Sequence, residues 1–277
     1  MDADYLSELF GLQGKVAVIT GGGGVLCSEM ARGLARAGAR IALLGLHEAN
    51  VRKVADEIRA QGGEAIALEC DVLDKTQVEA AAQQVLADFG QADILINGAG
   101  GTKPGAITGG GLTFFDLSEE AFRSVLDLNF IGSLLPCQVF GKRMAEQKEG
   151  VILNIASMSS FRPLTRVPAY SAAKAAIANF TQWLATHMAQ EYSPHIRVNA
   201  IAPGFLLAEQ NRRLLTDPES GALTERGQKI IQHTPLGRFL TPDELVSTVI
   251  WLVSPGARAV SGITVAVDGG FTAYCGV

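Results

Sequence analysis

The chain has 277 residues, a formal net charge of −5 and a pI near 5.4, and it contains no run of lysines or arginines. This charge argues against a nucleic-acid-binding surface, while 48% hydrophobic residues are enough for the core of a large globular domain. No stretch comes near the roughly 20 apolar residues of a membrane span, and the acidic N-terminus lacks signal-peptide features, so we expect a soluble, cytoplasmic protein that binds neither membrane nor nucleic acid.

Apolar runs of strand length alternate with longer segments of helical periodicity along the whole chain. Strands are predicted at Lys15–Thr20, Arg40–Leu44, Ala65–Cys70, Asp93–Ile96, Val151–Ala156, Ile196–Ile201 and Ile263–Val267. Helices are predicted at Val25–Gly38, His47–Gln61, Lys75–Phe89, Glu119–Lys148, Pro168–Glu191 and Pro242–Val253. Unbroken apolar strands are buried on both faces, and strand–helix alternation requires right-handed crossovers. The pattern therefore predicts an α/β fold, a doubly wound parallel sheet with helices on both faces, in a single domain of residues 1–277.

Two segments interrupt this alternation. Gly98–Thr113 is rich in glycine and is typical of a surface loop. Phe205–Gly237 carries proline, glycine and mixed charge, and it is longer than a simple connection needs to be. We interpret it as a small helical lid over a substrate site.

The chain has four scattered cysteines and no C-x-x-C pair: Cys27, Cys70, Cys137 and Cys275. This spacing favours neither a metal site nor a disulfide framework. We interpret all four as small buried apolar residues.

A glycine-rich turn, Thr20-Gly21-Gly22-Gly23-Gly24, follows the first predicted strand and precedes a helix. Glycines allow a sharp turn and a close backbone approach, and the helix N-terminus supplies unpaired N–H groups. The segment is therefore a candidate site for the pyrophosphate of a dinucleotide.

Tyr170 and Lys174 stand four residues apart in a predicted helix, so the phenol and the ammonium lie on one face. Reduction of a carbonyl requires a proton donor, and the reverse reaction requires a base. A tyrosine with a pKa of about 10 is a poor base at neutral pH, but a nearby cation favours its phenolate. The pair can therefore exchange a proton with a carbinol oxygen.

These segments resemble the short-chain dehydrogenase/reductase family over nearly the whole chain. TGGGGVLC is similar to the family fingerprint T-G-x-x-x-G-x-G, with Val25 and Cys27 at the second and third glycine positions. Asn97-Gly98-Ala99-Gly100, Asp71-Val72 and Pro203-Gly204 resemble further family segments that surround the cofactor. The resemblance implies a Rossmann-like sheet and an oxidoreductase that uses NAD or NADP.

The resemblance also implies site residues. The implied catalytic residues are Asn129, Ser157, Tyr170 and Lys174. The implied cofactor-binding residues are Thr20, Gly21, Gly22, Gly23, Val25, Leu26, His47, Asp71, Val72, Asn97, Gly98, Ala99, Tyr170, Lys174, Pro203 and Gly204. Among them Ser157 is expected to hydrogen-bond the substrate oxygen, and Lys174 the nicotinamide ribose.

The preference between NAD and NADP stays open. Gly45 stands where NAD-specific relatives carry the aspartate that binds the ribose hydroxyls. No arginine lies nearby for a 2′-phosphate, and His47 is the only candidate partner.

Several segments, among them GGTKPGAIT, PAYSAAKAAIANFTQWLA and LTERGQKIIQHTPLGR, look like the D-mannonate oxidoreductase (fructuronate reductase) branch of the family. The resemblance implies reversible reduction of D-fructuronate to D-mannonate, with a homotetramer as the assembly. The substrate candidates are Lys103, Ser157, Met158, Arg162 and Gln210, and further candidates near the expected site are Arg166, Asn211 and Arg213.

Other functions remain open. The chain could be another sugar-acid or polyol dehydrogenase, or a 3-oxoacyl-carrier-protein reductase, although no clear basic patch for an acidic carrier is present. The altered glycine loop also leaves room for a non-catalytic nucleotide-binding regulator.

Overall fold

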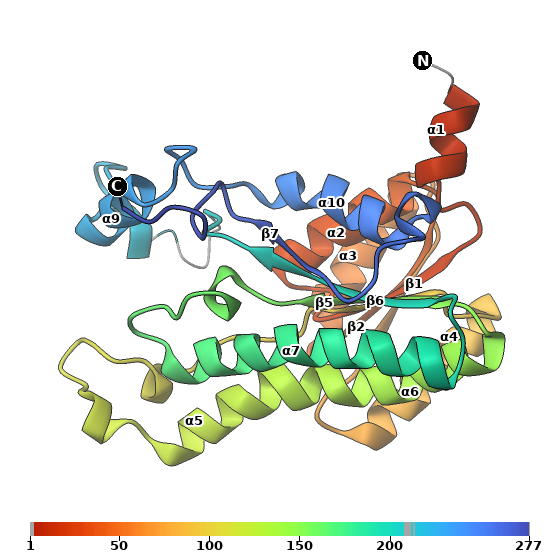
Figure 1. The fold of residues 1–277 in the computed structure, drawn as a ribbon, viewed down its shortest axis with the longest axis horizontal. Helices are drawn as coiled ribbons and strands as arrows, with labels where there is room; N and C mark the ends of the chain where they lie inside the picture. The colour runs from red at the N-terminus through yellow and green to blue at the C-terminus, as the bar shows by residue number, and fades with distance from the viewer. Residues whose placement is uncertain (1–2, 208–211, 213, 277) are drawn as a thin grey trace.

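The computed structural model describes residues 3–207, 212 and 214–276, which form a doubly wound α/β fold (Figure 1). Within these residues one sheet holds seven parallel strands in the order β3-β2-β1-β4-β5-β6-β7. The strands are β1 (Val16–Thr20), β2 (Arg40–Gly45), β3 (Ala65–Glu69), β4 (Ile94–Asn97), β5 (Gly150–Ile155), β6 (Ile196–Pro203) and β7 (Thr264–Val267). Each predicted strand is confirmed, and so is the parallel Rossmann-like sheet.

Helices cover both faces of the sheet (Figure 1). They are α1 (Ala3–Phe10), α2 (Val25–Arg36), α3 (Glu48–Ala60), α4 (Lys75–Phe89), α5 (Glu119–Leu126), α6 (Gly132–Gln147), α7 (Pro168–Glu191), α9 (Glu225–Gln232) and α10 (Val246–Val253). One apolar cluster joins α2, α3 and α10 to the sheet, and a second joins α4, α6 and α7 to its other face. Helix α1 was not predicted from the sequence, and it lies at the end of the molecule opposite α9 (Figure 1).

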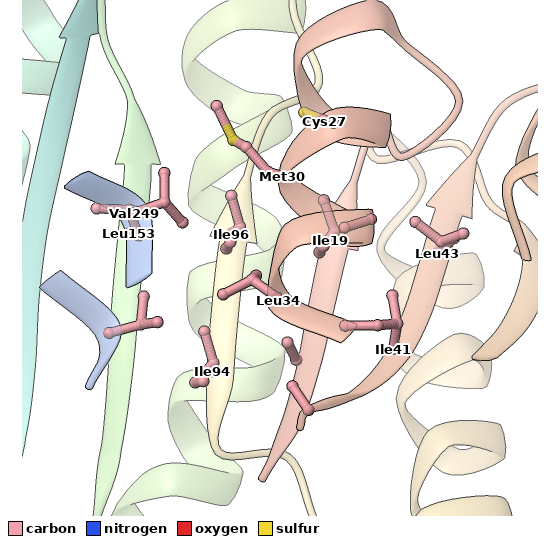
Figure 2. Packing of buried hydrophobic residues seen from close by; sticks show 14 of the residues in the cluster. Ile19, Cys27, Met30, Leu34, Ile41, Leu43, Ile94, Ile96, Leu153 and Val249 are labelled. Atoms are coloured by element: carbon pink, nitrogen blue, oxygen red, sulfur yellow. The ribbon is translucent and has the colours of Figure 1, made fainter. Parts of the chain in front are cut away.

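The central strands are buried on both faces, as their unbroken apolar runs predict. In β1, Ala17 and Ile19 join the cluster under α2, whereas Val16 and Val18 join the opposite cluster. Figure 2 shows Ile19 beside Leu34 of α2, with the neighbouring strands contributing further apolar side chains. This two-sided burial fixes the strand ends, and with them the loops that follow β1, β4, β5 and β6.

The long predicted helix at Glu119–Lys148 is present, but a π-helical turn at Asp127–Ile131 divides it into α5 and α6. Such turns insert one residue into the helical register and often occur at functional sites. By length and composition alone the span Glu119–Gln147 could cross a membrane, so the expectation that no stretch comes near a membrane span is wrong for this segment. In this fold, however, α6 packs on β4 and β5 as a core helix of the sheet.

The expectation of four buried cysteines is wrong at one position. Cys27, Cys70 and Cys137 are buried, but Cys275 is exposed. Cys275 lies on the C-terminal segment that follows β7, beyond the last strand of the sheet.

The predicted lid segment, residues 205–237, contains helix α9, which confirms helical structure there. Residues 208–211 and 213 lie outside the described residues, and the candidates Gln210, Asn211 and Arg213 are among them. Figure 1 shows α9 near the C-terminus, at the end of the molecule toward which the strand arrows point. This is the end where ligands bind in parallel sheets.

Candidate active site

A cavity of about 340 Å³ opens beyond the carboxyl ends of β1, β4, β5 and β6. Gly21 lines it with φ 65°, and a Cβ there would lie 2.9 Å from the backbone of Ala99. The Thr20 hydroxyl accepts hydrogen bonds from the N–H groups of Gly98 (3.1 Å) and Ala99 (3.3 Å), which ties the loops after β1 and β4 together. The glycine backbone and the start of α2 therefore form a narrow cradle, which fits the pyrophosphate of a dinucleotide.

In the altered fingerprint, the larger side chain at Cys27 is accommodated by the absence of a side chain at Gly98, an exchange of side-chain volume between the two positions. Cys27 is buried beside the cavity, and a Cβ on Gly98 would overlap its Sγ atom. The side chain absent at Gly98 thus leaves the room that Cys27 fills, and Val25 begins α2 with ordinary helical geometry. The substitutions at Val25 and Cys27 therefore keep the cradle open, and both residues line it.

Tyr170 and Lys174 both lie on α7 and line this same cavity. The Lys174 ammonium is 5.6 Å from the Tyr170 ring centroid and donates a 2.7 Å hydrogen bond to the carbonyl of Ile155. Lys174 is only 5% exposed, and this burial lowers its pKa to about 8. The pair shares one face of the helix, as its spacing predicts.

Ser157 follows β5 and reaches Tyr170. A hydrogen bond joins the two side chains, and the Ser157 hydroxyl also accepts one from the Ser159 N–H at 3.2 Å. Burial raises the pKa of Tyr170, and the bond from Ser157 opposes that rise. In the protein by itself the tyrosine is therefore a proton donor rather than a phenolate.

Asn129 is fully buried in the π-helical turn, at the wall of the cavity. Its amide donates to the carbonyls of Gly101 (2.7 Å) and Val125 (2.8 Å), and its oxygen accepts from the Gly101 N–H (3.1 Å). The side chain thus fixes the loop after β4 against the helix. A Cβ on Gly100 would lie 2.7 Å from this oxygen, so the loop approaches it closely.

The cavity brings together about half of the residues predicted from the sequence. Those that line it are Gly21, Val25, Leu26, Gly98, Asn129, Tyr170, Lys174 and Gly204. Those that do not are Thr20, Gly22, Gly23, His47, Asp71, Val72, Asn97, Ala99, Ser157 and Pro203. Several of these lie at the ends of β1, β2, β3 and β6, next to or outward from the cavity.

Asn97 points away from the cavity. Its amide donates to Asn154 Oδ1 at 2.9 Å and to Cys137 Sγ at 3.1 Å, within the layer between the sheet and α6. Only its backbone remains available to a ligand at the strand end. His47 is exposed at the start of α3.

A second cavity, of about 610 Å³, adjoins the first, and Phe205 lines both. Arg162 lines this second cavity and donates a 2.9 Å hydrogen bond to the Tyr274 carbonyl. Met158 is buried beside Ser157, whereas Lys103 is exposed and lines neither cavity. No residue of α9 was predicted at the site from the sequence, yet this helix contributes much of the wall, including Arg226 and Lys229.

Comparisons with known proteins agree with this geometry. The model of a family described as enoyl-(acyl carrier protein) reductase matches residues 25–272. The oxidoreductase UxuB of Bacillus subtilis is 50% identical over 275 residues, covering 96% of this chain and 98% of the relative.

Two solved structures have the same fold. A provisionally assigned D-mannonate oxidoreductase from Haemophilus influenzae, with bound NAD, has 46% identity and a TM-score of 0.91, covering 98% of this chain and 100% of that one. A gluconate 5-dehydrogenase from Burkholderia cenocepacia, in complex with NADP and tartrate, has 30% identity and a TM-score of 0.86, covering 97% and 99%.

Proposed function

This chain belongs to the short-chain dehydrogenase/reductase family and is an NAD(P)-dependent oxidoreductase, and we propose that it interconverts D-fructuronate and D-mannonate. The observation that carries the choice of a sugar acid is the arginine-lined cavity next to Tyr170. The name of the Haemophilus influenzae relative favours this substrate pair among sugar acids.

The first cavity would hold the nicotinamide dinucleotide, with Gly21 and the start of α2 at the pyrophosphate and Lys174 and Gly204 at the nicotinamide end. When bound, this cofactor supplies or accepts the hydride. A Cβ on Gly45 would lie 2.8 Å from Val51 Cγ1, so an aspartate at this position would not fit without a shift. The ribose of either NAD or NADP would therefore meet no carboxylate from the end of β2.

The proton is handled by the chain's own residues. In the direction of reduction, Tyr170 gives its phenolic proton to the developing alkoxide, and Ser157 donates a hydrogen bond to the same oxygen. Lys174 stabilises the phenolate that remains, because its ammonium lies one helical turn away on the same face. Asn129 holds the loop at Gly101 in place through three hydrogen bonds, and the π-helical turn is where a proton relay to solvent would begin.

The substrate's polar end would extend into the second cavity. A sugar acid needs a cation for its carboxylate and polar groups for its hydroxyls. Arg162 lies on this wall, and Met158 would pack beside the reacting carbon. We keep Lys103 as a candidate for the outer end of the substrate, while Gln210, which lies outside the described residues, stays a prediction from the sequence.

The proposal is tested by assaying hexuronates, aldonates and neutral ketones with NADH and NADPH in parallel. D-fructuronate should be reduced with the highest kcat/KM, and D-mannonate should be oxidised in the reverse direction. A higher kcat/KM with a 3-oxoacyl thioester would instead favour an acyl-carrier-protein reductase. A polyol or another aldonate as the best substrate would favour a different sugar dehydrogenase.

We also propose that the enzyme is a cytoplasmic homotetramer that pairs through α6 and α7. Trp183 is 56% exposed, stacks on His187 with ring centroids 4.7 Å apart, and lines an apolar groove between these two helices. A second copy of the same face would cover this surface. Sedimentation velocity should report a tetramer for the wild type and smaller species for Trp183→Glu, whereas an unchanged monomer in both would contradict the proposal.

A further inference from the structure

The second cavity is walled by two segments that lie far apart in the sequence. One is the loop that follows β5, residues 162–166, and the other is α9 (Figure 1). Their facing sides carry four cationic side chains: Arg162, Arg166, Arg226 and Lys229. The chain as a whole has a net charge of −5, so this concentration of positive charge is local.

Two of the four cations already have partners. Lys229 forms an ion pair with Glu225 at 2.5 Å, one turn apart on α9. Arg162 donates to the Tyr274 carbonyl, which ties the loop to the C-terminal segment. Neither side chain is therefore free to bind a ligand without losing an existing interaction.

Arg166 and Arg226 differ from these two. Among the described residues, neither guanidinium forms an ion pair, and neither donates a hydrogen bond. Burial lowers the pKa of Arg226, and the positive charge of Arg166 lowers it further. The two side chains therefore lie near enough to affect each other. Glu225 lies near Arg166 but is already paired with Lys229.

Both arginines are held in position by their backbones. The Arg166 carbonyl accepts a 2.9 Å hydrogen bond from the Thr108 N–H, and its side chain passes over Gly109. Arg226 is in the first turn of α9, which is capped by the Thr224 hydroxyl accepting from the Gly227 N–H at 3.1 Å. The cavity wall thus holds two positively charged guanidinium groups that face the same cavity. An anion bound between them would stabilise this arrangement.

We propose that Arg166 and Arg226 together bind the carboxylate of the substrate, one guanidinium from the loop after β5 and the other from α9. This inference rests on the proposed function, because it names the groups that would select a sugar acid. In D-fructuronate the ketone and the carboxylate lie toward opposite ends of the carbon chain. With the ketone at Tyr170, the carboxylate would extend past Phe205 into the second cavity, where both arginines lie.

The test compares Arg166→Gln and Arg226→Gln with the double variant Glu225→Gln/Lys229→Gln, a matched control on the same helix that removes the paired cation together with its carboxylate, so that no carboxylate is freed beside Arg166. KM and kcat are measured with D-fructuronate and with D-fructose, the neutral ketose of the same carbon skeleton. Each arginine variant should raise the KM for D-fructuronate by roughly 10- to 100-fold, the loss expected for a charge-assisted hydrogen bond. The rate with D-fructose and the affinity for NADH should stay unchanged, and the double variant Glu225→Gln/Lys229→Gln should behave as the wild type.

If D-fructuronate is turned over and both arginine variants keep the wild-type KM, the proposed arginine pair is wrong while the proposed function stands. An equal rise in KM for the double variant Glu225→Gln/Lys229→Gln would also overturn it, because the cavity wall in general, and not the arginine pair, would then explain the affinity.

A binding measurement separates the two proposals. If the wild type does not reduce D-fructuronate, calorimetric titration with D-gluconate in the presence of NAD tests the site directly. Binding that both arginine variants lose would support the pair and reject only the named substrate. Binding of inorganic phosphate in place of D-gluconate, lost in the same variants, would overturn the carboxylate assignment, and binding of neither anion would overturn both proposals.

Discussion

Replacing Lys174 with methionine tests the electrostatic environment of the site through protein stability rather than activity. Lys174 is almost fully buried, and burial lowers its pKa from the ordinary 10.5 to about 8. Below pH 8 the ammonium is charged in both the folded and the unfolded chain, so the folded protein bears the full cost of burying it. Between pH 8 and 10.5 the unfolded chain still holds the proton and the folded one does not, so stability rises with pH.

This difference in pKa corresponds to a rise of roughly 3 kcal/mol in the free energy of unfolding across that window. The substitution also removes the hydrogen bond to the Ile155 carbonyl, which costs about 1–3 kcal/mol at every pH. The two effects nearly cancel at neutral pH, so a single measurement there decides nothing. The dependence on pH separates them, because only the protonation effect changes with pH.

The assay is urea unfolding of the wild type and Lys174→Met at fixed protein concentration, at several values from pH 7 to pH 10.5. The free energy of the wild type relative to the variant should rise between pH 8 and 10.5, while turnover by the variant is lost. Lys53→Met, on the exposed side of α3, should parallel the wild type and serves as the control. Parallel curves for Lys174→Met and the wild type would refute the claim that a buried ammonium is held in the site.

Three further substitutions test separate parts of the site. Tyr170→Phe should lower kcat by at least roughly 100-fold and leave NADH affinity within the error of a fluorescence titration; retained turnover would remove the tyrosine from the mechanism. Gly98→Ala should destabilise the protein by about 1–3 kcal/mol, because the new Cβ overlaps Cys27 Sγ, and Cys27→Ala in the same chain should restore most of the loss; additive losses in thermal unfolding would contradict this exchange of volume. Asn129→Ala should lower both the midpoint of thermal unfolding and kcat, since three hydrogen bonds to Gly101 and Val125 are lost; unchanged hydrogen exchange at Gly101 would argue against this positioning role.

The sequence was sufficient to predict the architecture. Strands buried on both faces appear in the sequence as unbroken apolar runs, and helices repeat their apolar residues every three or four positions. Both kinds of element can therefore be recognised from a short stretch of sequence. The Tyr170–Lys174 pair and the glycine turn after β1 were predictable for the same reason, because each depends on spacing within one element. The structure places both members of the pair on the wall of one cavity, as that spacing requires.

Contacts between distant segments were decided only by tertiary structure. Arg226 was not singled out, because nothing near it in the sequence indicates that it faces Arg166 across a cavity. Asn97 stands beside glycines that line the first cavity, yet its side chain turns to Asn154 on the next strand. Cys27 fills the space above Gly98 only because of the way α2 packs against the loop after β4. Periodicity specifies which face of an element is buried, but which side chains meet there depends on the relative placement of elements that the chain brings together only on folding.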